Sequence, residues 1–113
     1  RAVLRRTSEQ TARAEKLSFD GLKIDAVARS VEVDGRQVAL TVREFDILFH
    51  LASHPRQVFA REQLLSSLWE DEFEGDASTV TVHVRRLRAK IEADASRPVH
   101  VRTVWGVGYK FEP

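Results

Sequence analysis

The chain has 113 residues, and a chain of this length can form one domain that buries about two-thirds of its unfolded surface. It contains no cysteine, which excludes disulfides and cysteine-ligated zinc, and no apolar run approaches the roughly 18 residues that cross a membrane. The formal net charge is only +1, but residues 1–16 carry +3, residues 17–76 carry −6 and residues 77–113 carry +4. We therefore expect one globular domain with a basic C-terminal part, and the start without methionine predicts a fragment of a longer protein.

The first 40 residues combine a polar segment with a small predicted sheet. Residues 7–16 are polar and have no apolar period, which is typical of an exposed linker. Short alternating apolar runs follow, and Asp34-Gly35 separates the last two. Asp-Gly is a strong hairpin signal because both positions can take a positive φ. We predict a small antiparallel sheet over residues 17–40.

The next segment carries the start and stop signals of a helix. Thr41 and Glu44 have capping-box spacing, and His54-Pro55 predicts the end. Apolar residues between them follow helical spacing and predict a core stripe: Phe45, Ile47, Leu48, Phe49, Leu51 and Ala52.

A second helix is predicted from Arg61 to Trp69. We expect Leu64, Leu65 and Leu68 to point inward, although Ala60 is a poor N-cap residue. An acidic loop then follows, and it comprises Glu70, Asp71, Glu72, Phe73, Glu74, Gly75 and Asp76.

A third helix is predicted over residues 78–92. Its aliphatic residues recur at helical spacing and form a core stripe: Val80, Val84, Leu87 and Ile91. The opposite face is polar and basic and presents Ser78, Thr81, Val82, Arg85, Arg86 and Ala89, with His83, Arg88 and Lys90 on its flanks. Apolar alternation after Pro98 and a glycine-bearing turn predict a hairpin over residues 99–111.

A helix with one buried face and one basic face suits the major groove of B-DNA, which admits a helix and displays a distinct pattern for each base pair. Arginine can bind guanine bidentately, and Val82 can contact a thymine methyl group. The flanking cations would lie nearer to phosphate oxygens, whose contacts carry no sequence information. The competing interpretation is a solvated basic face without a ligand.

Four segments of the chain, taken in order, resemble the effector domains of OmpR/PhoB-type response regulators. Residues 40–48, Leu-Thr-Val-Arg-Glu-Phe-Asp-Ile-Leu, are similar to the first-helix signature of that class. Arg-Glu-Gln-Leu-Leu from residue 61, followed by Leu68-Trp69, resembles its second helix. Val-His-Val-Arg-Arg-Leu-Arg-Ala-Lys-Ile, residues 82–91, resembles its recognition helix, and Thr-Val-Trp-Gly-Val-Gly-Tyr-Lys-Phe, residues 103–111, resembles its wing.

The resemblance implies an α+β fold, a winged helix-turn-helix with an N-terminal four-stranded antiparallel sheet, three helices and a C-terminal β-hairpin wing. Residues 1–16 would be the tail of a receiver domain and an interdomain linker, and residues 17–113 the DNA-binding domain. The third helix would read the major groove, and the wing, residues 99–111, would approach the minor groove. No enzymatic activity and no cofactor are implied.

Site roles also follow from the resemblance. The base-facing positions are Thr81, Val82, Arg85 and Arg86. The positions that match backbone-contacting or positioning sites are Trp69, Thr79, His83, Arg88 and Thr103. We add to this group, from their places on the helix and the wing, Ser78, Lys90, Arg102 and Trp105.

Partners beyond promoter DNA are implied as well. The loop at residues 70–76 would contact RNA polymerase or a neighbouring subunit. An upstream receiver domain, phosphorylated by a sensor kinase in a phosphorelay, would drive dimerisation. We expect the isolated domain to be a cytoplasmic monomer that dimerises on DNA sites, with direct repeats expected and a symmetric arrangement left open.

Three residues depart from the pattern of the class. Trp105 stands where arginine usually enters the minor groove, and Arg102 can substitute for that charge. Ser78 replaces a basic residue near the start of the recognition helix, and Glu70 replaces the glycine that commonly follows the second-helix tryptophan. These changes put the minor-groove contact, one phosphate contact and the contacts of the acidic loop in question.

Other functions receive less support from the sequence. Gly106-Val107-Gly108 lacks the strand-to-helix context of a phosphate loop, and His50 and His54 have helical metal-ligand spacing but no evident third ligand. The main alternative is a winged-helix module that contacts other proteins through the acidic loop.

Overall fold

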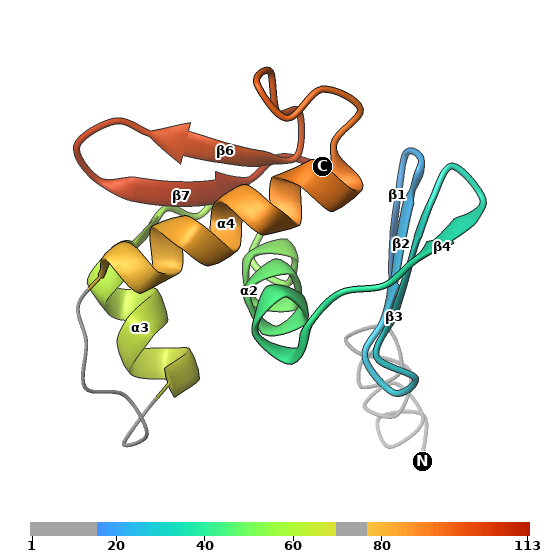
Figure 1. The fold of residues 1–113 in the computed structure, drawn as a ribbon, viewed down its shortest axis with the longest axis horizontal. Helices are drawn as coiled ribbons and strands as arrows, with labels where there is room; N and C mark the ends of the chain where they lie inside the picture. The colour runs from blue at the N-terminus through green and yellow to red at the C-terminus, as the bar shows by residue number, and fades with distance from the viewer. Residues whose placement is uncertain (1–15, 70–76) are drawn as a thin grey trace, which may run out of the picture. The chain divides into compact units, whose positions relative to one another are not determined.

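The structure is a computed structural model that describes residues 16–69 and 77–113. The chain divides into two compact units between Ala39 and Leu40. The first unit contains a four-stranded sheet, and the described part of the second contains three helices and a three-stranded sheet. Figure 1 shows the helices and the C-terminal hairpin of the second unit. The predicted interdomain linker, except Lys16, and the acidic loop at 70–76 lie outside the described residues. No helix in the described ranges is both long and apolar enough to cross a membrane.

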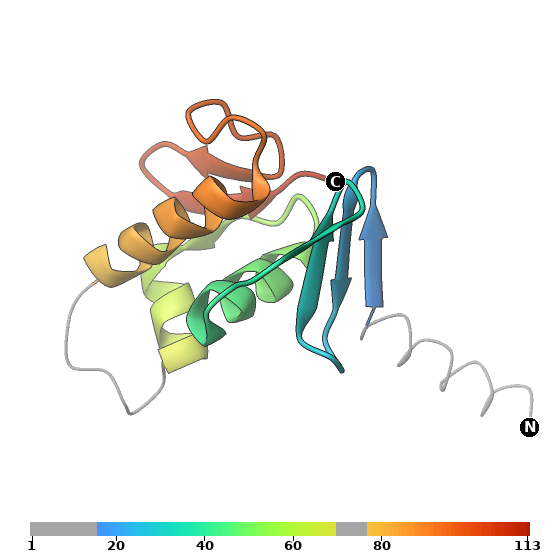
Figure 2. The same cartoon turned by 45° about the vertical axis from the view of Figure 1, so that its right-hand side comes forward.

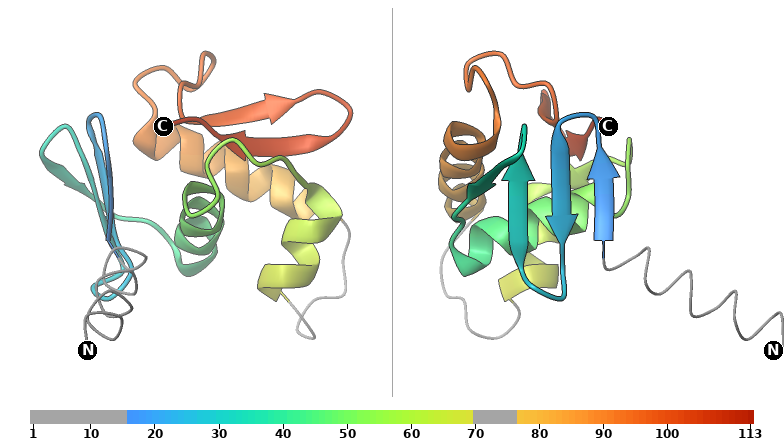
Figure 3. Two further views of the ribbon diagram at one scale, coloured as in Figure 1. Left: turned by 180° about the vertical axis from the view of Figure 1, so that it is seen from behind. Right: turned by 90° about the vertical axis from the view of Figure 1, so that its right-hand side faces the viewer.

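The first unit is an antiparallel sheet, as the sequence predicts, and its strands follow chain order as a meander. Its strands are β1 (Lys16–Phe19), β2 (Leu22–Asp25), β3 (Ser30–Val33) and β4 (Arg36–Val38). Figures 2 and 3 show neighbouring strands running in opposite directions. Asp34 and Gly35 connect β3 to β4 with φ angles of 51° and 81°, which confirms the Asp-Gly turn. Alternation places Leu22, Ile24 and Val31 on the buried face of this sheet.

Helix α2 spans Val42–Ala52 and begins with the predicted capping box. The Thr41 hydroxyl accepts from the Glu44 amide, and the Glu44 carboxylate accepts from the Thr41 amide at 3.0 Å. Five of the six expected core residues are buried, namely Phe45, Ile47, Leu48, Leu51 and Ala52. Phe49, the sixth, is half-buried and stacks beside Phe45 with ring centroids 6.0 Å apart.

Helix α3 (Arg61–Trp69) has the predicted bounds but not all of the predicted core residues. Gln63 Oε1 accepts from the Ala60 amide at 2.7 Å, which satisfies the helix start despite the poor N-cap residue. Leu64 is fully buried, whereas Leu65 and Leu68 are only half-buried. Trp69 is 7% exposed and completes the buried side of the helix.

Helix α4 spans Ser78–Ile91, so it ends one residue before the predicted limit of residue 92. Glu92 is its C-cap residue. The predicted stripe is confirmed, because the four aliphatic side chains are buried: Val80, Val84, Leu87 and Ile91. Glu92 is itself buried, and its carboxylate accepts from the amides of Val99 at 2.8 Å, His100 at 3.1 Å and Val101 at 2.8 Å. These bonds fix the chain where the hairpin begins.

The predicted wing forms strands β6 (Val101–Val104) and β7 (Gly108–Phe111), and it runs along α4 in Figures 1 and 3. A further short strand, β5 (Phe59–Ala60), pairs with β7 and makes the sheet order β5-β7-β6. A Cβ atom on Gly108 would lie 1.9 Å from the Phe59 carbonyl oxygen, so only glycine allows this pairing. The sequence did not predict β5, because two residues carry no periodic pattern.

Candidate nucleic-acid interface

The side of α4 opposite its buried stripe is exposed and basic. Arg85 and Arg86 are exposed, and Val82 is 40% exposed. Val82 precedes the two arginines by three and four residues, which places all three on one helical face. Ser78–Ile91 contains no acidic residue. Thr81, the fourth residue expected to face bases, is half-buried at the edge of this face, with its hydroxyl 3.3 Å from Arg61 Nη1 and 3.5 Å from the Tyr109 hydroxyl.

The first half of α4 is braced by an aromatic contact with α3. His83 Nδ1 lies 2.8 Å from the Thr79 carbonyl oxygen, and its ring meets the edge of Trp69 with centroids 5.4 Å apart. The Arg43 guanidinium covers Trp69 at 5.1 Å from the ring centroid. The buried Trp69 therefore restricts the orientation of the His83 ring, while the DNA-contacting or positioning roles expected of both residues stay predictions.

Two of the four cations in the second half of α4, Arg88 and Lys90, already have partners within the protein. Lys90 Nζ lies 2.6 Å from the buried Glu44 Oε1 on α2. Arg88 donates from Nε to the Val101 carbonyl oxygen at 2.8 Å and from Nη2 to the Thr103 hydroxyl at 2.7 Å. Burial lowers the pKa of Arg88, with opposing contributions from Tyr109 and Glu92, yet a guanidinium stays charged at neutral pH. The phosphate contacts expected of Arg88 and Lys90 stay predictions.

The tip of the wing presents exposed side chains between β6 and β7. Trp105 is 89% exposed and Val107 is 54% exposed, and Gly106 between them has a φ of 79°. Arg102 is exposed on β6, and its Nε donates to the Val99 carbonyl oxygen at 3.0 Å. The wing thus carries a large aromatic ring at its turn and an exposed cation, Arg102, on β6.

A hollow of about 530 Å³ separates the tip of the wing from the helices. The start of α3 contributes Arg61, α4 contributes Thr81 and Arg88, and the wing contributes Thr103 and Tyr109. Sequence reasoning did not select Arg61 or Tyr109. Only tertiary packing joins them to Thr81, so no local pattern carried that signal.

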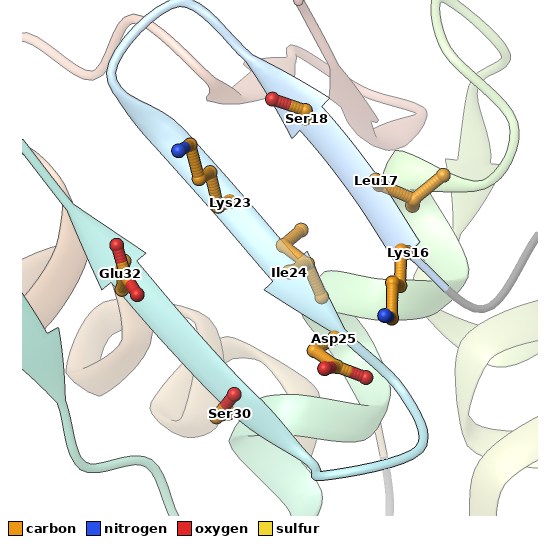
Figure 4. A pocket seen from close by; sticks show the side chains of 8 residues that line it. All are labelled: Lys16, Leu17, Ser18, Lys23, Ile24, Asp25, Ser30 and Glu32. Atoms are coloured by element: carbon orange, nitrogen blue, oxygen red, sulfur yellow. The ribbon is translucent and has the colours of Figure 1, made fainter. Parts of the chain in front are cut away.

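A second hollow, of about 360 Å³, lies on the four-stranded sheet (Figure 4). Lys16 faces Asp25 across β1 and β2, and Lys23 faces Glu32 across β2 and β3. Opposite charges in such register compensate each other, so this surface has no net attraction for a polyanion. No group of three or more metal-ligating side chains occurs among the residues that the structure describes.

The sequence profile of the family described as "Transcriptional regulatory protein, C terminal" matches residues 35–111. The chain belongs to this family. The matched region includes all three described helices and the wing.

Similar proteins agree with this membership. The transcriptional regulatory protein SrrA of Staphylococcus aureus (strain NCTC 8325 / PS 47) is 44% identical over 119 residues, which cover 99% of this chain and 49% of SrrA. The chain therefore spans about half the length of the curated relatives it matches.

Solved structures confirm the OmpR/PhoB resemblance and the winged helix-turn-helix fold. The Thermotoga maritima response regulator DrrB, an OmpR/PhoB homolog, superposes with a TM-score of 0.85 at 36% identity over 99% of this chain and 52% of DrrB. The DNA-binding domain of Klebsiella pneumoniae RstA, solved in complex with the RstA box, gives a TM-score of 0.78 at 38% identity over 87% of this chain and 97% of that domain.

Proposed function

We propose that this chain binds duplex DNA sequence-specifically as the output domain of a two-component response regulator that controls transcription. The observation that carries the proposal is the exposed basic face of α4, where Val82, Arg85 and Arg86 project from a helix without acidic residues. A helix anchored by one buried stripe and free on its basic face has the shape and charge that the major groove accepts.

In this proposal α4 and the wing use neighbouring grooves. Arg85 and Arg86 bind guanine edges, and Val82 contacts a thymine methyl group. His83 and the residues at the start of α4, Ser78 and Thr79, lie near phosphate oxygens. The wing approaches the minor groove, with Trp105 against the sugar-phosphate backbone because an indole lacks the charge that a narrow groove attracts.

The proposal also covers the domain boundary and the partners of the regulator. Residues 17–113 form the DNA-binding domain, which follows a receiver-domain tail and linker at residues 1–16. A sensor kinase phosphorylates the receiver, and the loop at 70–76 contacts RNA polymerase or a neighbouring subunit. The isolated domain is a monomer that dimerises on promoter DNA in the cytoplasm. These assignments are supported by the similarity to two longer proteins, the transcriptional regulatory protein SrrA and the response regulator DrrB, of which the chain covers about half.

Binding to a site selected from a random duplex library tests the proposal. Arg85→Ala and Arg86→Ala should each cost about 1–3 kcal/mol on the selected site and much less on random duplex, because base contacts specify the sequence. Arg97→Ala is the matched control, since it removes the same charge from an exposed loop position. Val84→Asp places a charge in the core stripe and should unfold the domain.

The competing protein-contact function predicts a different result. If Arg85→Ala and Arg86→Ala leave DNA binding unchanged while charge reversals in residues 70–76 abolish a protein contact, DNA reading by α4 is refuted. Salt-dependent binding of the wild-type chain to duplex DNA is the accompanying measurement, because phosphate contacts release counterions.

A further inference from the structure

Arg88 joins α4 to both strands of the wing. Its Nε donates to the Val101 carbonyl oxygen at 2.8 Å, and its Nη2 donates to the Thr103 hydroxyl at 2.7 Å, both on β6. The guanidinium carbon also lies 5.5 Å from the centroid of the Tyr109 ring on β7. One half-buried side chain therefore holds the helix, β6 and β7 together.

These contacts leave the Arg88 guanidinium less free to move than the charged group of an exposed side chain. Two of its five N–H groups are committed to β6, and Tyr109 covers the planar group. Hydrogen bonds from a charged donor are stronger than neutral ones, and a fork with two acceptors also fixes orientation. By contrast, Arg85 and Arg86 on the same helix are exposed.

A second, weaker connection lies closer to the start of the helix. The Tyr109 hydroxyl is 3.5 Å from Thr81 Oγ1, which Arg61 Nη1 approaches to 3.3 Å from the start of α3. Thr81 and Arg88 are two helical turns apart, at about 1.5 Å of rise per residue. Two separated attachments fix both the tilt and the position of a hairpin along a helix.

We infer that Arg88 is a positioning residue that fastens the wing to the recognition helix and sets the spacing between their two DNA contacts. The inference rests on the proposed function and deepens it. Arg88 then contributes to DNA affinity through the wing rather than by neutralising a phosphate. A wing already held in place loses less conformational freedom on binding, so its contact adds more to affinity.

Salt dependence separates positioning from phosphate contact. Arg88→Ala should weaken binding to the selected duplex by about tenfold, the factor that one charge-assisted hydrogen bond is worth, and leave the slope of log affinity against log salt unchanged. A slope shallower by about 0.9 would instead show that Arg88 neutralises a phosphate, and would overturn the inference.

A double-mutant cycle identifies the element through which Arg88 acts. A wing variant, Arg102→Ala with Trp105→Ala, removes two exposed wing side chains. Adding Arg88→Ala to this variant should cause little further loss of affinity, whereas adding it to Arg86→Ala should multiply the two losses. If the losses of affinity multiply fully in both combinations, with the wing variant and with Arg86→Ala, the inference is overturned.

Thr103 variants provide a milder perturbation for the case in which Arg88→Ala unfolds the domain. Thr103→Val keeps the shape and removes the acceptor, and it should reproduce the affinity loss with an unchanged salt slope. Thr103→Ser keeps the hydroxyl and should behave as wild type. If Thr103→Val also behaves as wild type, the inference is refuted. Failure of the wild-type chain to bind any duplex would instead refute the proposed function.

Discussion

Substituting Lys90 tests whether its ammonium serves stability or DNA binding. Lys90 Nζ lies 2.6 Å from Glu44 Oε1, and the side chains are 37% and 1% exposed respectively. Lys90→Met keeps an unbranched stem and leaves the buried carboxylate without its cation. Breaking a buried pair costs about 3–5 kcal/mol, but water screens the partly exposed lysine. We therefore expect a loss of about 2 kcal/mol, or about 10 °C in Tm.

Urea and thermal unfolding of Lys90→Met, Glu44→Gln and the double variant measure this coupling, and the double variant should lose less than the sum of the single losses. Lys110→Met is the control, because Lys110 pairs with Glu112 at 3.6 Å and both side chains are about one-third exposed or less. It should cost less than about 0.5 kcal/mol. An unchanged Tm for Lys90→Met, with a salt slope for DNA binding shallower by about 0.9, would show that Lys90 contacts phosphate instead.

Three further perturbations test other parts of the structure. Burial acts to raise the pKa of Glu44, but hydrogen bonds from Lys90 and Thr41 outweigh it and hold this pKa below the ordinary value of 4.5. A lowered carboxyl pKa gives stability that is present above the unfolded pKa and is lost as pH falls through the folded pKa, so the free energy of unfolding should decline below about pH 4.5. Glu44→Gln should lose less on acidification, and identical acid profiles would contradict this assignment. Glu92→Gln should cost about 2–3 kcal/mol in urea unfolding, because an amide offers one acceptor atom where the buried carboxylate accepts from three backbone amides. A loss within error would mean that the segment before β6 does not depend on that carboxylate. Trp105→Arg should raise DNA affinity and steepen its salt dependence, because it restores a cation at the exposed wing turn. A tenfold loss of affinity in a titration at fixed salt would show that the indole has a specific role.

Helix-start and periodicity signals within one segment of the sequence predicted the helices that such signals determine. The capping box at Thr41 and the aliphatic stripe of α4 were sufficient to define two helices, because both operate within a few turns of one segment. Strand β5 could not be predicted, since its two residues become a strand only by pairing with β7, about 50 residues further along the chain.

The same distinction applies to the candidate site. Helical spacing was enough to place Arg85 and Arg86 on an exposed face. It could not give the partners of Arg88 and Lys90, because Thr103 is 15 residues away and Glu44 is 46 residues away. A helical pattern defines the direction of a side chain, whereas its charge partner depends on which distant segment packs there.

The base and the tip of the wing differ in the substitutions that the fold allows. At its base, a side chain on Gly108 would collide with Phe59 in β5, which directly precedes α3. At its tip, a Cβ atom on Gly106 would meet nothing within 4 Å, and Trp105 and Val107 are exposed. Single substitutions at Trp105 or Val107 leave the core intact. If the wing approaches the minor groove as proposed, a lineage can therefore change its groove preference at these two positions while α4 and the fold stay the same.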